Sequence, residues 1–153
     1  MLRGPGVVFL LLILCSAGCG GDGLERVPIT GVLTVKGVPL AGASVQFAPG
    51  TGTPGEGALG LSDPQGKFEV ISSRRDDSGI PPGEYSVRVS LLMDPDGTVL
   101  SPDATQADHP FARESVPPPY SGMDSPLKVT IGDAGGEVKV DIPVALLTPK
   151  KKK

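Results

Sequence analysis

Cys19 is the residue whose chemical role the sequence indicates most clearly. An apolar run of eight residues, VVFLLLIL at 7–14, follows Arg3, and three small residues at 16–18 stand directly before the cysteine. This run is far shorter than the roughly 20 residues that cross a bilayer, so residues 1–18 are predicted to be an export signal. Cleavage after them would leave the thiol of Cys19 at the start of the exported chain, where it can be acylated.

The stretch LLLILCSAGCGGDG, residues 10–23, resembles a bacterial lipobox, in which the cysteine is acylated and becomes residue one. Ser16 stands where a lipobox usually has leucine. The resemblance implies a lipid anchor at Cys19, and more than one acyl chain would hold the protein durably on a membrane. The alternative is an ordinary cut after an A-x-A-like site, which leaves Cys19 as a free thiol. Because Cys15 is the only other cysteine, the exported domain has none for an internal disulfide.

The single histidine and an aspartate-rich stretch at 94–98 are the candidates for acid–base or metal chemistry. One histidine cannot build a site that needs several, so we expect His109 to be a solvated loop side chain. The stretch DPDGT begins like a calcium loop, but Val99 and Thr105 stand where an EF-hand needs glycine and glutamate. We expect a turn there, and the alternative is a looser calcium site on Asp94, Asp96 and Asp103.

Other catalytic motifs are absent from the sequence. It contains no G-x-S-x-G, no P-loop and no zinc-spaced His/Cys cluster, and no cysteine follows Cys19. We therefore expect no enzymatic activity, no cofactor and no metal ion. Residues 19–149 contain seventeen acidic residues against nine basic ones, which argues against a nucleic-acid partner.

Two charged segments are predicted to be solvated. RRDDSG at 74–79 mixes both signs at an expected hairpin end, where ion pairs contribute little energy. The C-terminal lysines repel one another and are expected to form a solubilising tail, with contact to anionic lipid or wall polymer as the alternative. These lysines are Lys150, Lys151, Lys152 and Lys153.

The exported part is predicted to be one all-β domain at 29–144, with a flexible tether at 19–28 and a basic tail at 145–153. Glycines and prolines punctuate short runs in which apolar and polar residues alternate, as in half-buried strands. We expect about seven strands in one antiparallel sandwich, including a hairpin at 57–72. The runs are 29–35, 43–48, 58–61, 68–72, 85–91, 127–131 and 138–144.

The segment 93–124 breaks this pattern. Its six prolines and six acidic residues cannot pair continuously in a ladder. A connection of this length is unusual in a compact domain. We expect a disordered spacer, and the alternative is a functional excursion.

The succession ITGVLTVKGVPLAGASVQFAP, ALGLSDPQGKFEV, IPPGEYSVRV and PPPYSGMDSPLKVTIGDAGGEVKVDIPV resembles the small lipoproteins of planctomycete-type bacteria that carry a carboxypeptidase regulatory-like, transthyretin-like domain. The resemblance covers most of 29–144. It implies a seven-stranded, transthyretin-like or Ig-like sandwich without catalysis. Tyr85 is expected to lay its ring in the core and its hydroxyl against the backbone at the rim, and an ordinary amphipathic strand residue is the alternative.

Two functions follow from these expectations. The first is a non-catalytic, lipid-anchored β-sandwich, an interaction or structural module at the cell envelope. It would bind or support another protein, an envelope polymer, or an assembly to which it lends an edge strand. The alternative is a carbohydrate-binding module, whose platform would need exposed aromatic rings. The chain has no Trp, and of the aromatic residues in the exported part only Phe111 and Tyr120 lie outside the predicted strands. We expect the outer membrane as the location, on either its periplasmic or its surface face, because Gly20 stands where some lipoproteins of the inner membrane have aspartate.

Overall fold

The computed structural model describes residues 22–72, 79–105 and 107–148, which form an all-β fold. Cys19 and the export signal lie outside the described residues, as do both arginines of the 74–79 segment and the four C-terminal lysines. Within the described ranges, no helix is long and apolar enough to cross a membrane.

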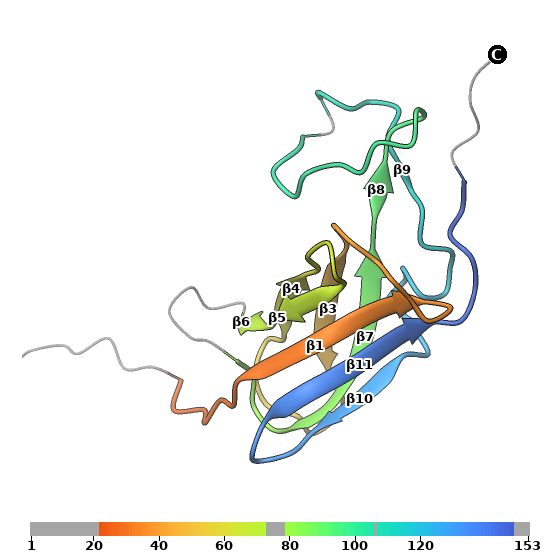
Figure 1. Ribbon diagram of the computed structural model, residues 1–153. Helices are drawn as coiled ribbons and strands as arrows, with labels where there is room; N and C mark the ends of the chain where they lie inside the picture. Colours follow the sequence, from red (N-terminus) through yellow and green to blue (C-terminus); the bar gives the residue numbers. More distant parts are fainter. Residues whose placement is uncertain (1–21, 73–78, 106, 149–153) are drawn as a thin grey trace, which may run out of the picture.

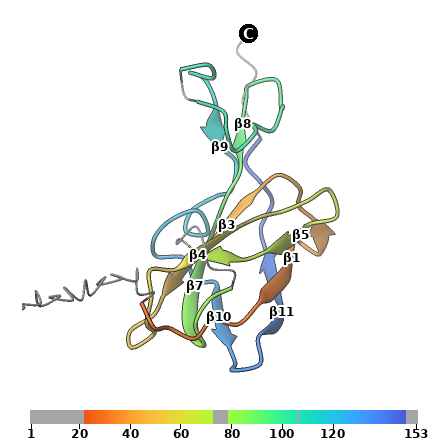
Figure 2. The ribbon, with the colours of Figure 1, turned by 90° about the vertical axis from the view of Figure 1, so that its left-hand side faces the viewer.

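The strands of the described residues form three sheets (Figure 1). The four-stranded sheet consists of β11 (Gly136–Ile142), β1 (Ile29–Val35), β2 (Val38–Pro39) and β5 (Lys67–Glu69), and both β2 and β5 pair with β1. The five-stranded sheet has the order β10 (Lys128–Ile131), β7 (Gly83–Ser90), β3 (Ser44–Pro49), β4 (Ala58–Leu61) and β6 (Ile71–Ser72). The third sheet pairs β8 (Leu92–Met93) with β9 (Arg113–Glu114) in a lobe that projects from one end of the molecule (Figure 2).

The four-stranded and five-stranded sheets pack face to face as a β-sandwich, and the core lies between them (Figure 2). The alternation predicted for β3 is confirmed, because Val45 and Phe47 are buried while Gln46 is exposed. The alternation predicted for 85–91 is also confirmed, since Tyr85, Val87, Val89 and Leu91 are all fully buried. The opposite sheet contributes Ile29, Leu33, Phe68, Val140 and Ile142 to the same core.

The pairing of β1 with β11 differs from the antiparallel sandwich that the sequence predicts. The two strands run parallel over their full lengths, from Ile29 opposite Gly136 to Val35 opposite Ile142. Parallel strands need a long crossover, and the chain between residues 35 and 136 supplies it. The prediction that the last run extends to Val144 is wrong, because β11 ends at Ile142 and Val144 is exposed.

Only the turn of the hairpin predicted at 57–72 is confirmed, because the strands on its two sides do not pair with each other. The amide of Gly66 donates to the carbonyl of Asp63 over 2.9 Å, which closes the expected turn. However, β4 belongs to the five-stranded sheet, whereas β5 pairs with β1 in the other sheet. The turn therefore carries the chain across the sandwich, and only β6 returns to β4, with Ile71 opposite Leu59.

The segment 93–124 has hydrogen-bonded structure of its own, which differs from the expected disordered spacer. The turn predicted at 94–98 is confirmed, with the Asp94 amide donating to the Thr98 carbonyl over 2.9 Å. His109 is not simply solvated, because its Nδ1 lies 2.6 Å from Oδ2 of Asp94. This pair links the 94–98 turn to the far side of the lobe.

Glu114 on β9 connects the base of the lobe to the sandwich. Its Oε1 accepts hydrogen bonds from the amides of Leu91 and Val116, both over 2.9 Å. Its Oε2 accepts a hydrogen bond from the hydroxyl of Ser90 over 2.5 Å. One partly buried carboxylate thus joins the end of β7 to the chain that returns from the lobe.

The prediction for Tyr85 is confirmed. Its ring is buried in the core, and its hydroxyl donates to the carbonyl of Pro81 over 2.8 Å. Burial raises the pKa of the Tyr85 hydroxyl, with a smaller opposing effect from the charge of Arg26, so the group is a donor at neutral pH.

Replacing Tyr85 with phenylalanine is expected to lower the free energy of unfolding by about 1 kcal/mol, because the buried Pro81 carbonyl loses its partner. Urea unfolding measures this difference. The matched control is Tyr120→Phe, which removes a hydroxyl for which the described residues provide no hydrogen bond and should change stability little. Equal effects of the two substitutions would contradict the role assigned to the Tyr85 hydroxyl.

Asp141 on β11 stabilises the turn between β1 and β2. Lys36 and Gly37 both have positive φ, at 52° and 79°, the combination that a tight hairpin turn requires. Oδ1 of Asp141 accepts hydrogen bonds from the Thr34 hydroxyl over 2.5 Å and from the Gly37 amide over 2.9 Å. These two bonds, the first more than the second, lower the pKa of Asp141.

Because the pKa of Asp141 in the folded protein lies below that in the unfolded chain, ionised Asp141 contributes stability that is fully present above the unfolded value of about 3.9. The contribution is lost as the pH falls through the folded pKa. We expect Asp141→Asn to cost up to about 1 kcal/mol at pH 7, a small effect because the carboxylate is exposed. Urea unfolding at pH 7 and at low pH checks this, and a cost that is equal at both would contradict it.

Candidate functional site

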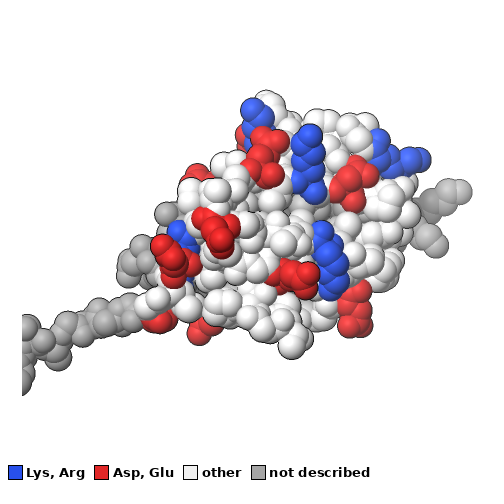
Figure 3. Space-filling model, turned by 90° about the horizontal axis from the view of Figure 1, so that it is seen from below, with Lys and Arg blue, Asp and Glu red and all other residues white. Residues whose placement is uncertain are grey.

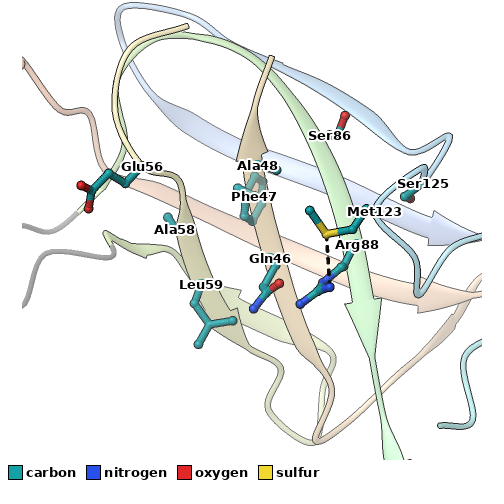
Figure 4. Close-up of a pocket in the computed structure, with 10 residues that line it drawn as sticks. All are labelled: Gln46, Phe47, Ala48, Glu56, Ala58, Leu59, Ser86, Arg88, Met123 and Ser125. Carbon is teal, nitrogen blue, oxygen red and sulfur yellow. Dashed lines mark hydrogen bonds between the residues drawn. The ribbon is translucent and has the colours of Figure 1, made fainter. Parts of the chain in front are cut away.

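A pocket of about 230 Å³ lies on the outer face of the five-stranded sheet, away from the core (Figure 4). Most of its floor consists of outward-facing positions on β3, β4 and β7, and two buried residues of these strands, Phe47 and Ala58, also line it. The loop before β10 adds Met123 and Ser125 at one side. The pocket therefore depends on both the sheet and the chain that returns from the lobe.

The strand register brings three side chains into a row across the pocket. Gln46 on β3 lies opposite Leu59 on β4 and opposite Arg88 on β7. Adjacent strands are about 4.8 Å apart, so the row covers about 10 Å from Leu59 to Arg88. An amide in the middle thus separates an aliphatic side chain from a guanidinium group.

The two ends of the pocket carry opposite charges. Nη1 of Arg88 lies 3.4 Å from the sulfur of Met123, and a thioether is only a weak acceptor. Lys128 stands opposite Ser86 in the register, and its Nζ contacts the Ser86 hydroxyl. Glu56 lies at the other end, beyond Ala58 (Figure 4). The β7 side of the pocket is therefore basic and the β4 side acidic.

An apolar strip adjoins the acidic end. We use this name for Leu59, Leu61 and Ile71, whose exposed fractions are 46%, 47% and 57%. Leu59 and Ile71 stand directly opposite each other on β4 and β6. Met123, on the other side of the pocket, is 76% exposed. This face of the sheet thus presents apolar surface on both sides of Gln46 and Arg88.

The residues that the sequence singled out lie elsewhere. Phe111 is 59% exposed on the lobe, whereas Tyr120 packs against the core and its carbonyl accepts a hydrogen bond from the Val89 amide. Asp94 is paired with His109. In the part of the chain that the structure describes, no three His, Cys, Asp or Glu residues are placed to hold a metal ion. None of these residues lines the pocket.

Sequence reasoning placed Arg88 on the solvent side of its strand but missed the pocket. The signal that was available is the outward position of two leucines in the run ALGL at 58–61, where polar residues would be usual. The approach of Met123 to Arg88 had no such signal, because it depends on the path of the long 93–124 segment.

Charges of both signs are interspersed on the face of the molecule shown in Figure 3. That face has no continuous basic surface of the kind that binds the phosphate backbone of a nucleic acid.

Comparisons with known proteins find a structural likeness but no family. No protein-family model and no curated protein matches the chain. Among solved structures, the chain is similar to the major pilin subunit of Bacillus cereus, BcpA, with a TM-score of 0.41 and 19% sequence identity. The match covers 78% of this chain and 30% of the pilin subunit, so the chain spans less than a third of that protein.

Proposed function

We propose that this protein is a non-catalytic interaction module, exported and held at the cell envelope by a lipid on Cys19. In this proposal the sandwich is of the transthyretin-like type, and its location is the outer membrane. The apolar run at 7–14 and the small residues before Cys19 support the anchor. The partner is another envelope protein, bound by the outer face of the five-stranded sheet.

The observation that carries the binding function is the apolar strip beside the pocket. Large aliphatic side chains on the outer face of a sheet are common as single residues, but adjacent ones rimmed by polar groups mark interaction sites. Here Leu59 and Ile71 are neighbours, and Gln46 and Arg88 continue the same surface. Covering this face would remove aliphatic surface from water, at roughly 25 cal/mol per Å².

Site-specific photocrosslinking in intact cells of the native host tests this function. A photoreactive amino acid at Gln46 is expected to capture a discrete partner, whereas the same amino acid at Lys139, exposed on the opposite sheet, should not. Leu59→Glu should abolish the product formed from position 46. Capture of the same proteins from both positions, or of none, would contradict the assignment of this face.

The carbohydrate-binding alternative has less support. It needs a platform of exposed rings, and Tyr120 is half-buried against the core. Phe111 alone stays on the surface of the lobe.

A further inference from the structure

We propose that the pocket binds a carboxylate of an extended peptide segment, with Arg88 holding the carboxylate and Leu59 contacting an apolar side chain two residues away. This inference rests on the proposed function and names the ligand chemistry of the same face. It goes beyond that proposal because it predicts which peptide sequences bind.

Arg88 is the group that selects for a carboxylate. Its guanidinium has five N–H donors in a fork that matches a carboxylate, yet within residues 22–72, 79–105 and 107–148 its polar contact is the Met123 sulfur. No carboxylate of the described residues pairs with it. A ligand carboxylate would therefore gain charge-assisted hydrogen bonds without having to break an existing ion pair.

The neighbours of Arg88 favour the same ligand. Gln46 stands opposite Arg88 and offers an amide donor, and Lys128 on the adjacent strand adds a second positive charge through its contact with Ser86. Glu56 at the other end would repel a second acidic group. A ligand with one carboxylate on the β7 side and a neutral or basic group on the β4 side fits this distribution of charge.

The shape of the pocket favours a peptide over a sugar. A pyranose ring is usually stacked on an exposed aromatic ring, but the one aromatic residue of the lining, Phe47, is buried. The walls are aliphatic instead, from Leu59 and Met123. The volume of about 230 Å³ is below the ~300–1,000 Å³ of sites for drug-sized ligands, so only a few residues would enter.

Strand geometry fixes the spacing of the ligand residues. Side chains on one face of an extended peptide recur every two residues, about 6.6–6.8 Å apart. The row from Leu59 to Arg88 covers about 10 Å between backbones, and the guanidinium of Arg88 shortens this span because it extends toward Gln46 (Figure 4). A peptide that lies across the strands would therefore place an apolar residue near Leu59 and an aspartate, two positions away, at Arg88.

An NMR titration tests this pairing. The protein is the chain from residue 19 onward with Cys19→Ser, and the probes are acetylated, amidated pentapeptides Ser-Leu-Gly-Asp-Ser and Ser-Leu-Gly-Asn-Ser. We expect the aspartate peptide to bind at least tenfold more tightly and to shift the amide signals of Gln46, Leu59 and Arg88. Arg88→Gln should remove this preference and Arg88→Lys should keep part of it, while Lys139→Gln, on the opposite sheet, should leave it unchanged.

Equal affinity for the two peptides, or an aspartate preference that survives in Arg88→Gln, would overturn the proposal. Binding of oligogalacturonate with the same Arg88 dependence but no binding of the peptides would also overturn it, because the ligand would then be a sugar acid. These failures are separate from failure of the proposed function, since a crosslink from position 46 that is unaffected by Arg88→Gln would still support a protein partner on this face.

Discussion

Replacing Phe68 with alanine is expected to lower the free energy of unfolding by about 3–5 kcal/mol. Phe68 belongs to β5 in the four-stranded sheet, and its ring is buried between the two sheets. Domains of this size are stable by about 5–15 kcal/mol, so the variant would lose a large part of its stability.

Two glycines make room for the Phe68 ring. A Cβ added at Gly31 on β1 would lie 2.2 Å from Cζ of Phe68, and one added at Gly60 on β4 would lie 2.9 Å from Cδ2. The ring therefore fills the space that both sheets leave open. It also lies 6.1 Å from the ring of Phe47, a distance typical of aromatic pairs.

This arrangement predicts coupling between Phe68 and Gly31. Gly31→Ala is expected to lower the free energy of unfolding of the natural protein by about 1–3 kcal/mol, because the Phe68 ring has to move. In the Phe68→Ala background the same substitution should cost much less, since the clash is gone. Urea unfolding of the four proteins measures the coupling, with Leu61→Ala at an exposed position as the control. Additive effects of the two substitutions would contradict the packing described.

Replacing Glu114 with alanine is expected to lower the free energy of unfolding by about 2–3 kcal/mol. It should also loosen the attachment of the lobe to the sandwich. The carboxylate accepts hydrogen bonds from the Leu91 and Val116 amides and from the Ser90 hydroxyl. Hydrogen bonds to charged groups contribute about 1.5–3 kcal/mol, and partly buried amides without a partner are costly. Urea unfolding gives the loss of stability.

Hydrogen exchange locates the effect of Glu114. We expect faster exchange of the amides of Leu91 and Val116 in Glu114→Ala, with little change at Val45 in the centre of the five-stranded sheet. Glu114→Gln keeps one accepting oxygen and should be intermediate. Unchanged exchange at residues 91 and 116 would show that the lobe is held to the sandwich by other contacts.

The sequence predicted the buried faces because alternation with period two is a local property. Val45 and Phe47, or Tyr85 and Val87, have the same buried side whichever strand becomes their neighbour. The turns at Lys36-Gly37 and at 63–66 were predictable for a similar reason, since glycine and proline act on the local backbone.

The pairing of the strands was not predictable in this way. Alternation in 29–35 and 136–142 says nothing about direction, so the parallel pair of β1 and β11 had no local signal. The same holds for the turn at 63–66. Its sequence would be the same whether the strands on its two sides pair with each other or enter different sheets. No local pattern in the long segment 93–124 indicates its hydrogen-bonded structure, because its stabilising contacts, above all those of Glu114, are made to distant strands.

The candidate site could be predicted only in part. The outward direction of Arg88 follows from the alternation of its strand. Its place in a row with Gln46 and Leu59 depends on a register between three strands. Cys19, in contrast, is a prediction from the sequence alone and lies outside the described residues.

The central claim is that this domain works at the cell envelope, and the mass of the protein from its native host tests it most directly. We expect a chain that begins at Cys19 and carries the added mass of diacylglycerol and acyl groups, with membrane association that is lost in Cys19→Ala. A product of unmodified mass in the soluble fraction would contradict the anchor, and would leave a secreted β-sandwich with a free thiol.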